Sequence, residues 1–139
     1  METSKSLAEE PLQALGRHAH WLLRLSLLGV FTYHGIDKFM GGGITEFATI
    51  MQLPWLIALL VALTEIAAGV LVVVGGLSNA WVTRLGALLV IPIMFGAIIM
   101  EHWGQWHFMA TPTHPLGGMQ FQFTLLMIAF YLLIRGNAR

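Results

Sequence analysis

Apolar residues dominate four stretches of the chain, and short polar segments separate them. The stretches cover residues 19–40, 54–76, 79–102 and 118–135. An apolar helix needs roughly 20 residues to cross the hydrocarbon core of a bilayer, and runs this long and continuous are not typical of strands. A tight turn joins the second and third stretches, which predicts an antiparallel hairpin. The pattern therefore predicts an all-α integral membrane protein, an antiparallel bundle of four transmembrane helices.

The composition favours a membrane environment over a water-soluble fold. Of the 139 residues, 57% are hydrophobic and only 10% are charged, whereas soluble domains usually carry about 25% charged residues. Seven basic and seven acidic side chains balance, so nucleic acid is not an expected partner. The absence of cysteine excludes disulfides and thiolate-bound clusters. Residues 1–18 are a polar lead-in without the features of a signal peptide, and residues 19–139 form one domain that holds the four spans.

Basic residues are distributed unevenly around the predicted spans. Only Lys38 lies near the connections 41–53 and 103–117, whereas the other ends carry Lys5, Arg17, Arg84, Arg135 and Arg139. Because cytoplasmic segments are enriched in Lys and Arg, both termini are expected in the cytoplasm and the two connections on the periplasmic or exterior side. The chain is thus expected to be a multi-pass protein in the lipid bilayer of a prokaryotic inner membrane.

The first span is unusually polar. One helical stripe along it carries Arg24, Phe31, His34, Gly35 and Lys38. A charged group inside a span costs about 2.5–3.5 kcal/mol on insertion scales. Because lipid cannot satisfy these polar groups, the stripe is expected to face protein.

Glu65 is a second polar residue inside a span, about 16 Å from the start of its helix and near the bilayer midplane. A lone carboxylate at this depth either protonates or finds a cation. Arg24 is the first expected partner, and His34 is the alternative. Two interpretations stay open: an Arg24–Glu65 pair that fixes the register of the bundle, or a carboxylate that accepts a proton or contacts a quinone.

Titratable groups also gather at the outer end of the third span, in residues 101–108. His102 and His107 are poorly spaced for two ligands on one regular helix, but Gly104 between them is expected to break the helix. One hypothesis is a metal centre formed by His102, His107 and Glu101. A second is haem ligation by His34 and His102. The third is that His107 and His114 are interfacial histidines in a solvated loop.

The sequence resembles the DoxX family of small membrane proteins with four helices. The matching stretches are residues 24–39, 64–88, 95–108 and 117–138, so the resemblance covers nearly all of residues 20–138. The positions of the family pattern are held here by Arg24, His34, Gly35, Lys38, Glu65, Gly69, Arg84 and His102. Members often have an acidic residue at the start of the fourth helix, where this chain has Gln120 and Gln122.

The resemblance implies a membrane-redox context, since the namesakes of the family are subunits of an archaeal thiosulfate:quinone oxidoreductase. The first functional hypothesis is therefore a membrane redox protein or subunit that passes electrons from an outer-face donor to the quinone pool. Its expected catalytic residues are His34, Lys38 and Glu65, and Arg24, Phe31, His34 and His102 are expected to bind the quinone or a haem cofactor.

Two further hypotheses give the chain other roles. The second is a non-catalytic accessory subunit that packs against other membrane or periplasmic subunits, and the third is a small transporter. A homo-oligomer is an alternative to partner subunits.

Overall fold

The computed structural model describes residues 11–137, and over that range the chain is all-helical without strands. The first helical rod comprises α2 (His20–Leu27), the π-helical turn η1 (Leu28–Thr32) and α3 (Tyr33–Asp37). It is followed by the short α4 (Gly43–Ile50) and the long α5 (Trp55–Leu77). The chain continues through α6 (Ala80–Ala97), a second π-helical turn η2 (Ile98–His102) and, after a long connection, α7 (Gln120–Arg135).

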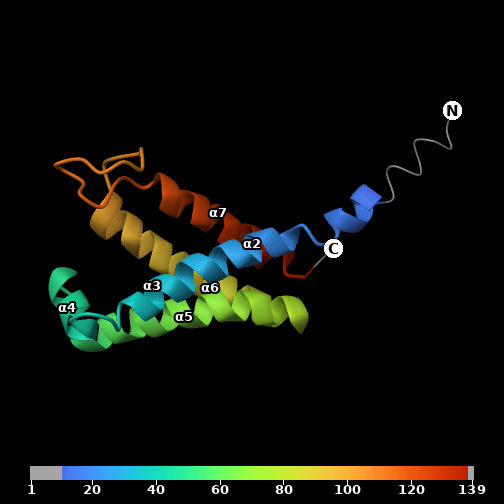
Figure 1. Ribbon diagram of the computed structural model, residues 1–139, viewed down its shortest axis with the longest axis horizontal. Helices are drawn as coiled ribbons and strands as arrows, with labels where there is room; N and C mark the ends of the chain where they lie inside the picture. The colour runs from blue at the N-terminus through green and yellow to red at the C-terminus, as the bar shows by residue number, and fades with distance from the viewer. Residues whose placement is uncertain (1–10, 138–139) are drawn as a thin grey trace.

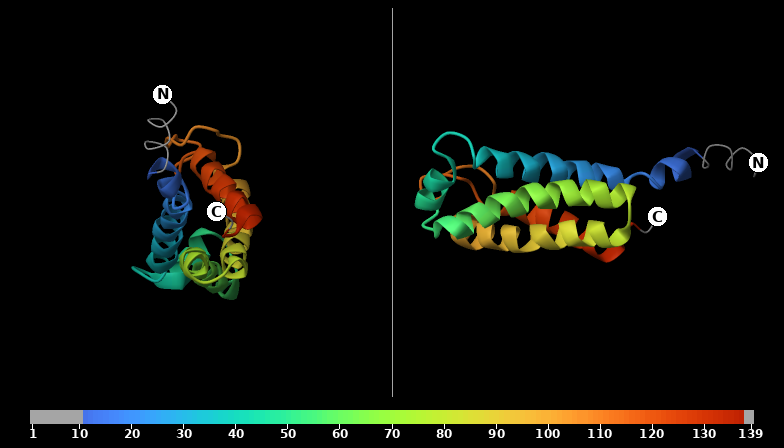
Figure 2. Two further views of the ribbon diagram at one scale, coloured as in Figure 1. Left: turned by 90° about the vertical axis from the view of Figure 1, so that its right-hand side faces the viewer. Right: turned by 90° about the horizontal axis from the view of Figure 1, so that it is seen from below.

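The long helices lie side by side, and the two ends of the molecule differ (Figures 1 and 2). One end, here the basal end, holds the start of α2, the turn between α5 and α6, and the end of α7. The opposite end, here the cap end, holds α4 and the connection 103–119. Consecutive long helices therefore run in opposite directions, as the sequence pattern indicates.

Small residues let the helices approach most closely at the basal end. A Cβ atom built on Gly75 would clash with the backbone nitrogen of Thr83, and one on Gly86 would lie 2.8 Å from that of Val72. The main apolar core surrounds these contacts and includes the fully buried Leu27 and Val90. From this tight base, α5 and α6 diverge toward the cap end (Figure 1), where the cavities described below lie.

The boundaries of the helices follow the sequence pattern closely, with one addition. The predicted spans 54–76, 79–102 and 118–135 correspond to α5, to α6 with η2, and to α7. Each predicted boundary lies within two residues of the observed one. The addition is α4, in the connection 41–53, where the sequence predicts only a link. Its buried Ile44 and Ala48 pack against Ala58 and Ala62 of α5, so α4 covers the cap end of that helix.

The surface of the structure is strongly apolar. The rods α5 (Trp55–Leu77) and α6 with η2 (Ala80–His102) are long and apolar enough to cross a membrane, and Gln120–Arg135 is a shorter apolar helix. Leu60, Leu88 and Ile134 are examples of large apolar side chains that are about half exposed or more along the helices. Water would disfavour such a surface, whereas lipid accommodates it.

Candidate functional site

An ion pair between the first rod and α5 is the centre of the candidate site. Lys38 Nζ lies 2.6 Å from Glu65 Oε2, and the two side chains are 15% and 8% exposed. Lys38 Nζ also donates to the backbone oxygen of His34 at 3.2 Å, and it lies 4.8 Å from the centre of the Phe47 ring. The sequence predicts that Lys38 and Glu65 belong to one site, and the structure brings them into direct contact.

The predicted Arg24–Glu65 pair is wrong. Arg24 donates to the backbone oxygen of Val72 and to Thr83 Oγ1. Val72 is seven residues beyond Glu65, about 10 Å along the helix. In this antiparallel register, the end of the first rod that carries Lys38 lies opposite Glu65, and Arg24 lies near the basal end. Arg24 is therefore outside the cleft, and its predicted role in cofactor binding has no support in its position.

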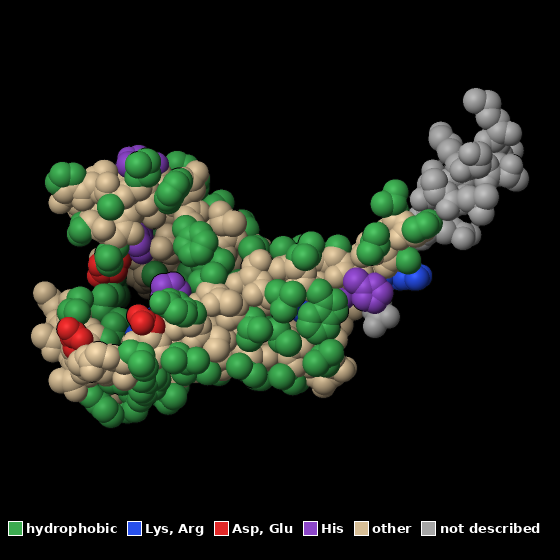
Figure 3. Space-filling model, in the orientation of Figure 1, with side chains coloured by type: hydrophobic (Ala, Val, Ile, Leu, Met, Phe, Trp, Pro, Cys, Tyr) green, Lys and Arg blue, Asp and Glu red, His purple; other side chains and the backbone are tan. Residues whose placement is uncertain are grey.

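A cleft of about 380 Å³ opens beside the ion pair. Its volume is in the range of about 300–1,000 Å³ that is usual for small-molecule sites. It is lined by Val30, Phe31, His34, Lys38, Met51, Glu65, Met94, Ala97, Glu101, His102, Leu116, Phe121, Gln122 and Leu125. Figure 3 shows a hollow at the cap end with acidic and histidine side chains around it. The cleft thus combines apolar walls with a few polar groups, and of the predicted site residues it gathers Phe31, His34, Lys38, Glu65, Glu101 and His102.

Two titratable side chains in the cleft have no hydrogen bond or ion pair among the described residues. These are the exposed His34 imidazole, which has an edge-on ring contact with Tyr33 and an electrostatic interaction with Glu65, and the Glu101 carboxylate. His34 projects from α3, and Glu101 from η2 on the opposite side of the bundle. Both groups are therefore available to a ligand that enters between the first rod and α6 with η2.

His102, in contrast, is held by the protein at both ring nitrogens. Nδ1 lies 2.8 Å from the backbone oxygen of Gly117, and Nε2 lies 2.8 Å from Gln122 Nε2. Because a carbonyl only accepts, His102 Nδ1 donates to Gly117, and in the neutral ring Nε2 accepts from the Gln122 amide. Gln122 Oε1 is buried without a partner in the described structure. In the sequence, Gln122 stands out only as a departure from the family pattern, and nothing there connects it to His102.

These contacts bear on the haem and metal hypotheses. Both nitrogens of His102 are engaged, so this side chain does not fit an axial haem ligand in the observed arrangement. Within residues 11–137 the structure holds no group of three His, Asp or Glu side chains arranged to bind a metal ion. The donor set Glu101, His102 and His107 is therefore not brought together, because the chain leaves the helix after His102 and exposes His107 on the cap.

The connection 103–119 forms an ordered cap over the cleft. Gln105 Nε2 donates to the backbone oxygens of His107 and Met109 at 2.9 and 2.6 Å, and Thr111 Oγ1 donates to Gln105 Oε1 at 2.7 Å. His114 Nε2 donates to the backbone oxygen of Trp103 at 2.7 Å. His114 therefore stabilises the cap, rather than only solvating a loop, and Gln105 is a central residue that sequence reasoning misses.

Both π-helical turns lie beside the cleft. η1 directly precedes His34 and Lys38, and η2 contains Glu101 and His102. A π-helical turn adds a residue to the helix and is frequent at functional sites. Thr32, at the end of η1, has a buried hydroxyl without a partner in the described structure. These turns have no compositional signal, so a regular helical wheel could not reveal them.

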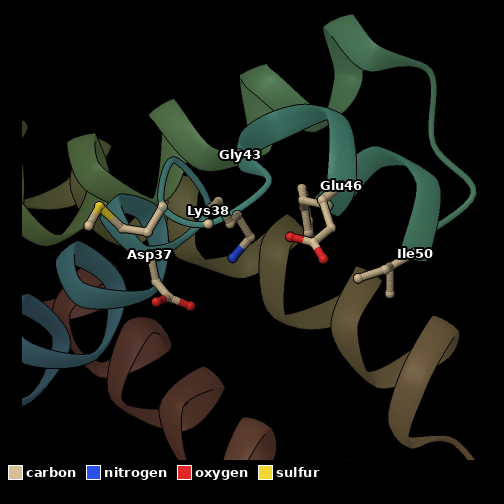
Figure 4. A pocket seen from close by; sticks show the side chains of 8 residues that line it. Asp37, Lys38, Gly43, Glu46 and Ile50 are labelled. Atoms are coloured by element: carbon tan, nitrogen blue, oxygen red, sulfur yellow. The ribbon is translucent and has the colours of Figure 1, made fainter.

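Two acidic side chains lie on the outer side of the ion pair. A pocket of about 300 Å³, here the vestibule, is lined by Asp37, Lys38 and Glu46 together with apolar and glycine residues. Figure 4 shows the Lys38 amine between the carboxylates of Asp37 and Glu46. Lys38 therefore lines both the vestibule and the cleft, and it connects the cap surface with the buried Glu65.

Comparison with known proteins identifies a family for the chain. The family model named DoxX matches residues 19–103, which is more than half of the chain and includes His34, Lys38, Glu65 and His102. The chain belongs to the DoxX family. No curated protein and no solved structure matches it. The family membership and the two apolar helices of spanning length together identify this DoxX protein as a membrane protein.

Proposed function

We propose that this DoxX protein is a multi-pass redox protein or subunit of a prokaryotic inner membrane, and that its cleft binds a quinone. In this proposal the protein passes electrons from a donor at the outer face to the quinone pool. The observation that carries the proposal is the Lys38–Glu65 ion pair in the wall of an apolar cleft. The His34 and Glu101 side chains, which form no hydrogen bond or ion pair in the described structure, line the same space.

The proposed topology places all the long helices in the bilayer as an antiparallel four-helix bundle. Arg17, Arg84 and Arg135 lie at the basal end, which supports a cytoplasmic location for that end and for both termini. Trp103 and Trp106 are exposed on the cap, which suits a position at the membrane–water interface on the outer side of the inner membrane. The cap is also the surface on which the donor, a partner protein or subunit, would reach the cleft.

The residues of the cleft fit a quinone headgroup. A planar ring needs apolar walls, which Phe31, Leu125 and Met94 provide, and each ring carbonyl needs a hydrogen-bond donor. Lys38 and His34 can donate from one side of the cleft, and the Gln122 amide lies on the other. When bound, a quinone supplies reversible redox chemistry of two electrons and two protons.

The chain's own polar groups provide proton handling around such a ring. Lys38 holds a charged N–H group beside the cleft, and Glu65 holds an acceptor oxygen 2.6 Å from it. Asp37 and Glu46, in the vestibule on the other side of Lys38, link this pair to the outer aqueous phase. Leu116 of the cap lines the same cleft and limits the access of water.

Binding of a water-soluble, headgroup-only benzoquinone to the full-length protein in nanodiscs tests the proposal. Isothermal titration is expected to show saturable binding to the wild type. Lys38→Met removes a charged hydrogen-bond donor worth about 1.5–3 kcal/mol, so the Kd should rise about 10- to 100-fold. Arg17→Met is the matched control, since it removes an exposed cation at the basal end, and it should leave the Kd unchanged.

A double variant separates binding from folding. Lys38→Met alone leaves the buried Glu65 carboxylate without its partner, which destabilises the protein. Lys38→Met/Glu65→Gln removes both charges and should recover much of the stability while binding stays weak. The proposal fails if the wild type does not bind the headgroup, or if the double variant binds it as tightly as the wild type.

A further inference from the structure

A second cavity lies beside the ion pair and shares Lys38 and Glu65 with the cleft. This side pocket has a volume of about 180 Å³. It is lined by Lys38, Phe47, Met51, Leu53, Val61, Glu65, Pro92, Ile93, Gly96, Ala97, Met100 and Glu101. Apart from the charged groups that it shares with the cleft, the lining is apolar, so the side pocket is suited to a hydrocarbon.

The side pocket and the cleft adjoin each other. Both are lined by Lys38, Met51, Glu65, Ala97 and Glu101. These shared residues form the boundary between a chamber with several polar groups and a chamber with few. A molecule with a polar ring and an apolar chain would match these two chambers. Its ring would lie in the cleft beside His34, and its chain would extend past Ala97 into the side pocket.

The side pocket has a rim on the outside of the bundle. Its walls are α5, α6 with η2, Lys38, and α4 with the link that follows it, and the rods α5 and α6 separate toward the cap end (Figure 1). Pro92 and Met100, on its rim, are exposed on the outside of the bundle. Gly96 has no atom within 4 Å of its Cβ position, so this part of the wall has free space beside it. An apolar chain could therefore leave the protein sideways into the bilayer.

The geometry points to the side pocket as the site that holds the isoprenoid tail of the quinone. This inference rests on the proposed function and adds how the substrate reaches the cleft. The ring passes laterally from the bilayer between α5 and α6, while the vestibule and the cap stay on the aqueous side. A headgroup without a tail would occupy the cleft alone.

A bulky residue at Gly96 tests the inference because it fills the side pocket without touching the cleft. Gly96 lines the side pocket only, and the free space around it lets Gly96→Trp fold. Gly29→Trp is the matched control, since Gly29 is exposed and also has no atom within 4 Å of its Cβ position. Val61→Phe, on the opposite wall of the side pocket, provides a second variant if Gly96→Trp is unstable.

Each protein is titrated in nanodiscs with two ligands, the headgroup-only benzoquinone and the same ring with a short isoprenoid tail. Gly96→Trp should raise the Kd of the tailed quinone about tenfold and leave that of the headgroup within about twofold. Gly29→Trp should change neither. If Gly96→Trp and Val61→Phe weaken both ligands equally, or neither, the tail site is refuted while the quinone site stands. If neither ligand binds the wild type, the proposed function itself fails.

Discussion

Arg24 provides a sharp test of how the basal end is held together. Its side chain is fully buried, and each of its five N–H groups has an acceptor. Nε donates to His20 Nδ1, Nη1 to the Val72 oxygen and Thr83 Oγ1, and Nη2 to the Gly136 oxygen and Asn137 Oδ1, at 2.5–3.0 Å. No carboxylate in the described part of the chain forms an ion pair with it.

The partial charges of helix ends compensate this buried cation. α5 and α7 both have their C-terminal ends at the basal end, where the helix dipole is negative. Gly136 immediately follows α7 and takes a φ of +58°, which turns the chain back over Arg24. The contacts therefore connect the first rod to α5, α6 and the end of α7.

The expected loss for Arg24→Met follows from these contacts. Methionine keeps most of the apolar packing but removes all five donors. The Gly136 oxygen then loses its partner, while Asn137 Oδ1 still accepts from Thr83 Oγ1. A buried acceptor without a partner costs about 1–3 kcal/mol. The free energy lost with the charged hydrogen bonds is larger than the desolvation cost that is relieved when the cation is removed. The free energy of unfolding should fall by about 2–4 kcal/mol.

Equilibrium unfolding in mixed detergent micelles, followed by far-UV circular dichroism, measures this free energy. Arg24→Lys should lose less than Arg24→Met, about 1–2 kcal/mol, because three ammonium donors replace part of the network. Arg17→Met is the exposed control, with an expected change within about 0.5 kcal/mol. An Arg24→Met protein as stable as the wild type would refute the assigned role of the network.

Three further predictions concern packing, the cap and topology. Gly75→Leu should lower the free energy of unfolding by about 1–3 kcal/mol or more, since its Cβ would meet the backbone of α6, whereas Gly29→Ala should not lower it. Gln105→Leu should speed hydrogen exchange in the cap but not in α5; unchanged protection of the cap would contradict its central role. In this cysteine-free chain, a membrane-impermeant maleimide should label Thr113→Cys in intact cells and Ser78→Cys only after lysis. The reverse labelling would invert the proposed topology.

The helical segments could be predicted from the sequence because their signal is local. Length and continuous hydrophobicity fix where α5, α6 and α7 begin and end, and this requires no knowledge of their neighbours. Lys38, Glu65 and His34 could be singled out in the same way, since charged or polar side chains inside an apolar span demand a partner. The identity of that partner, however, depends on how two helices slide along each other.

This dependence on register explains the wrong pairing. Arg24 and Lys38 are on the same stripe of the first rod, and hydrophobicity does not show which of them faces Glu65. The close approach of Gly35 to Ala62 and Ile66 fixes the register, and it is a steric fact visible only in three dimensions. Glu65 is paired with a cation, as expected from the sequence, but the cation is Lys38 and not Arg24.

Other parts of the site depend on single hydrogen bonds between distant segments. The contact of His102 with Gly117 and Gln122 forms only when the long cap closes over the helix ends. Asn137, which binds Arg24, Thr83 and the Gly75 oxygen, lies in a short polar tail without a helical pattern. Residues of this kind have ordinary local sequences, so only the folded structure reveals what they do.

Photolabelling with a tailed azidoquinone tests the central claim most directly. The full-length protein in nanodiscs is labelled, digested and mapped by mass spectrometry. The account predicts adducts on residues of the cleft in α3 and η2, suppressed by excess unlabelled quinone and lost in Lys38→Met/Glu65→Gln. Adducts spread over the lipid-facing surfaces, neither competed by quinone nor changed by the double variant, would contradict a quinone site at the Lys38–Glu65 pair.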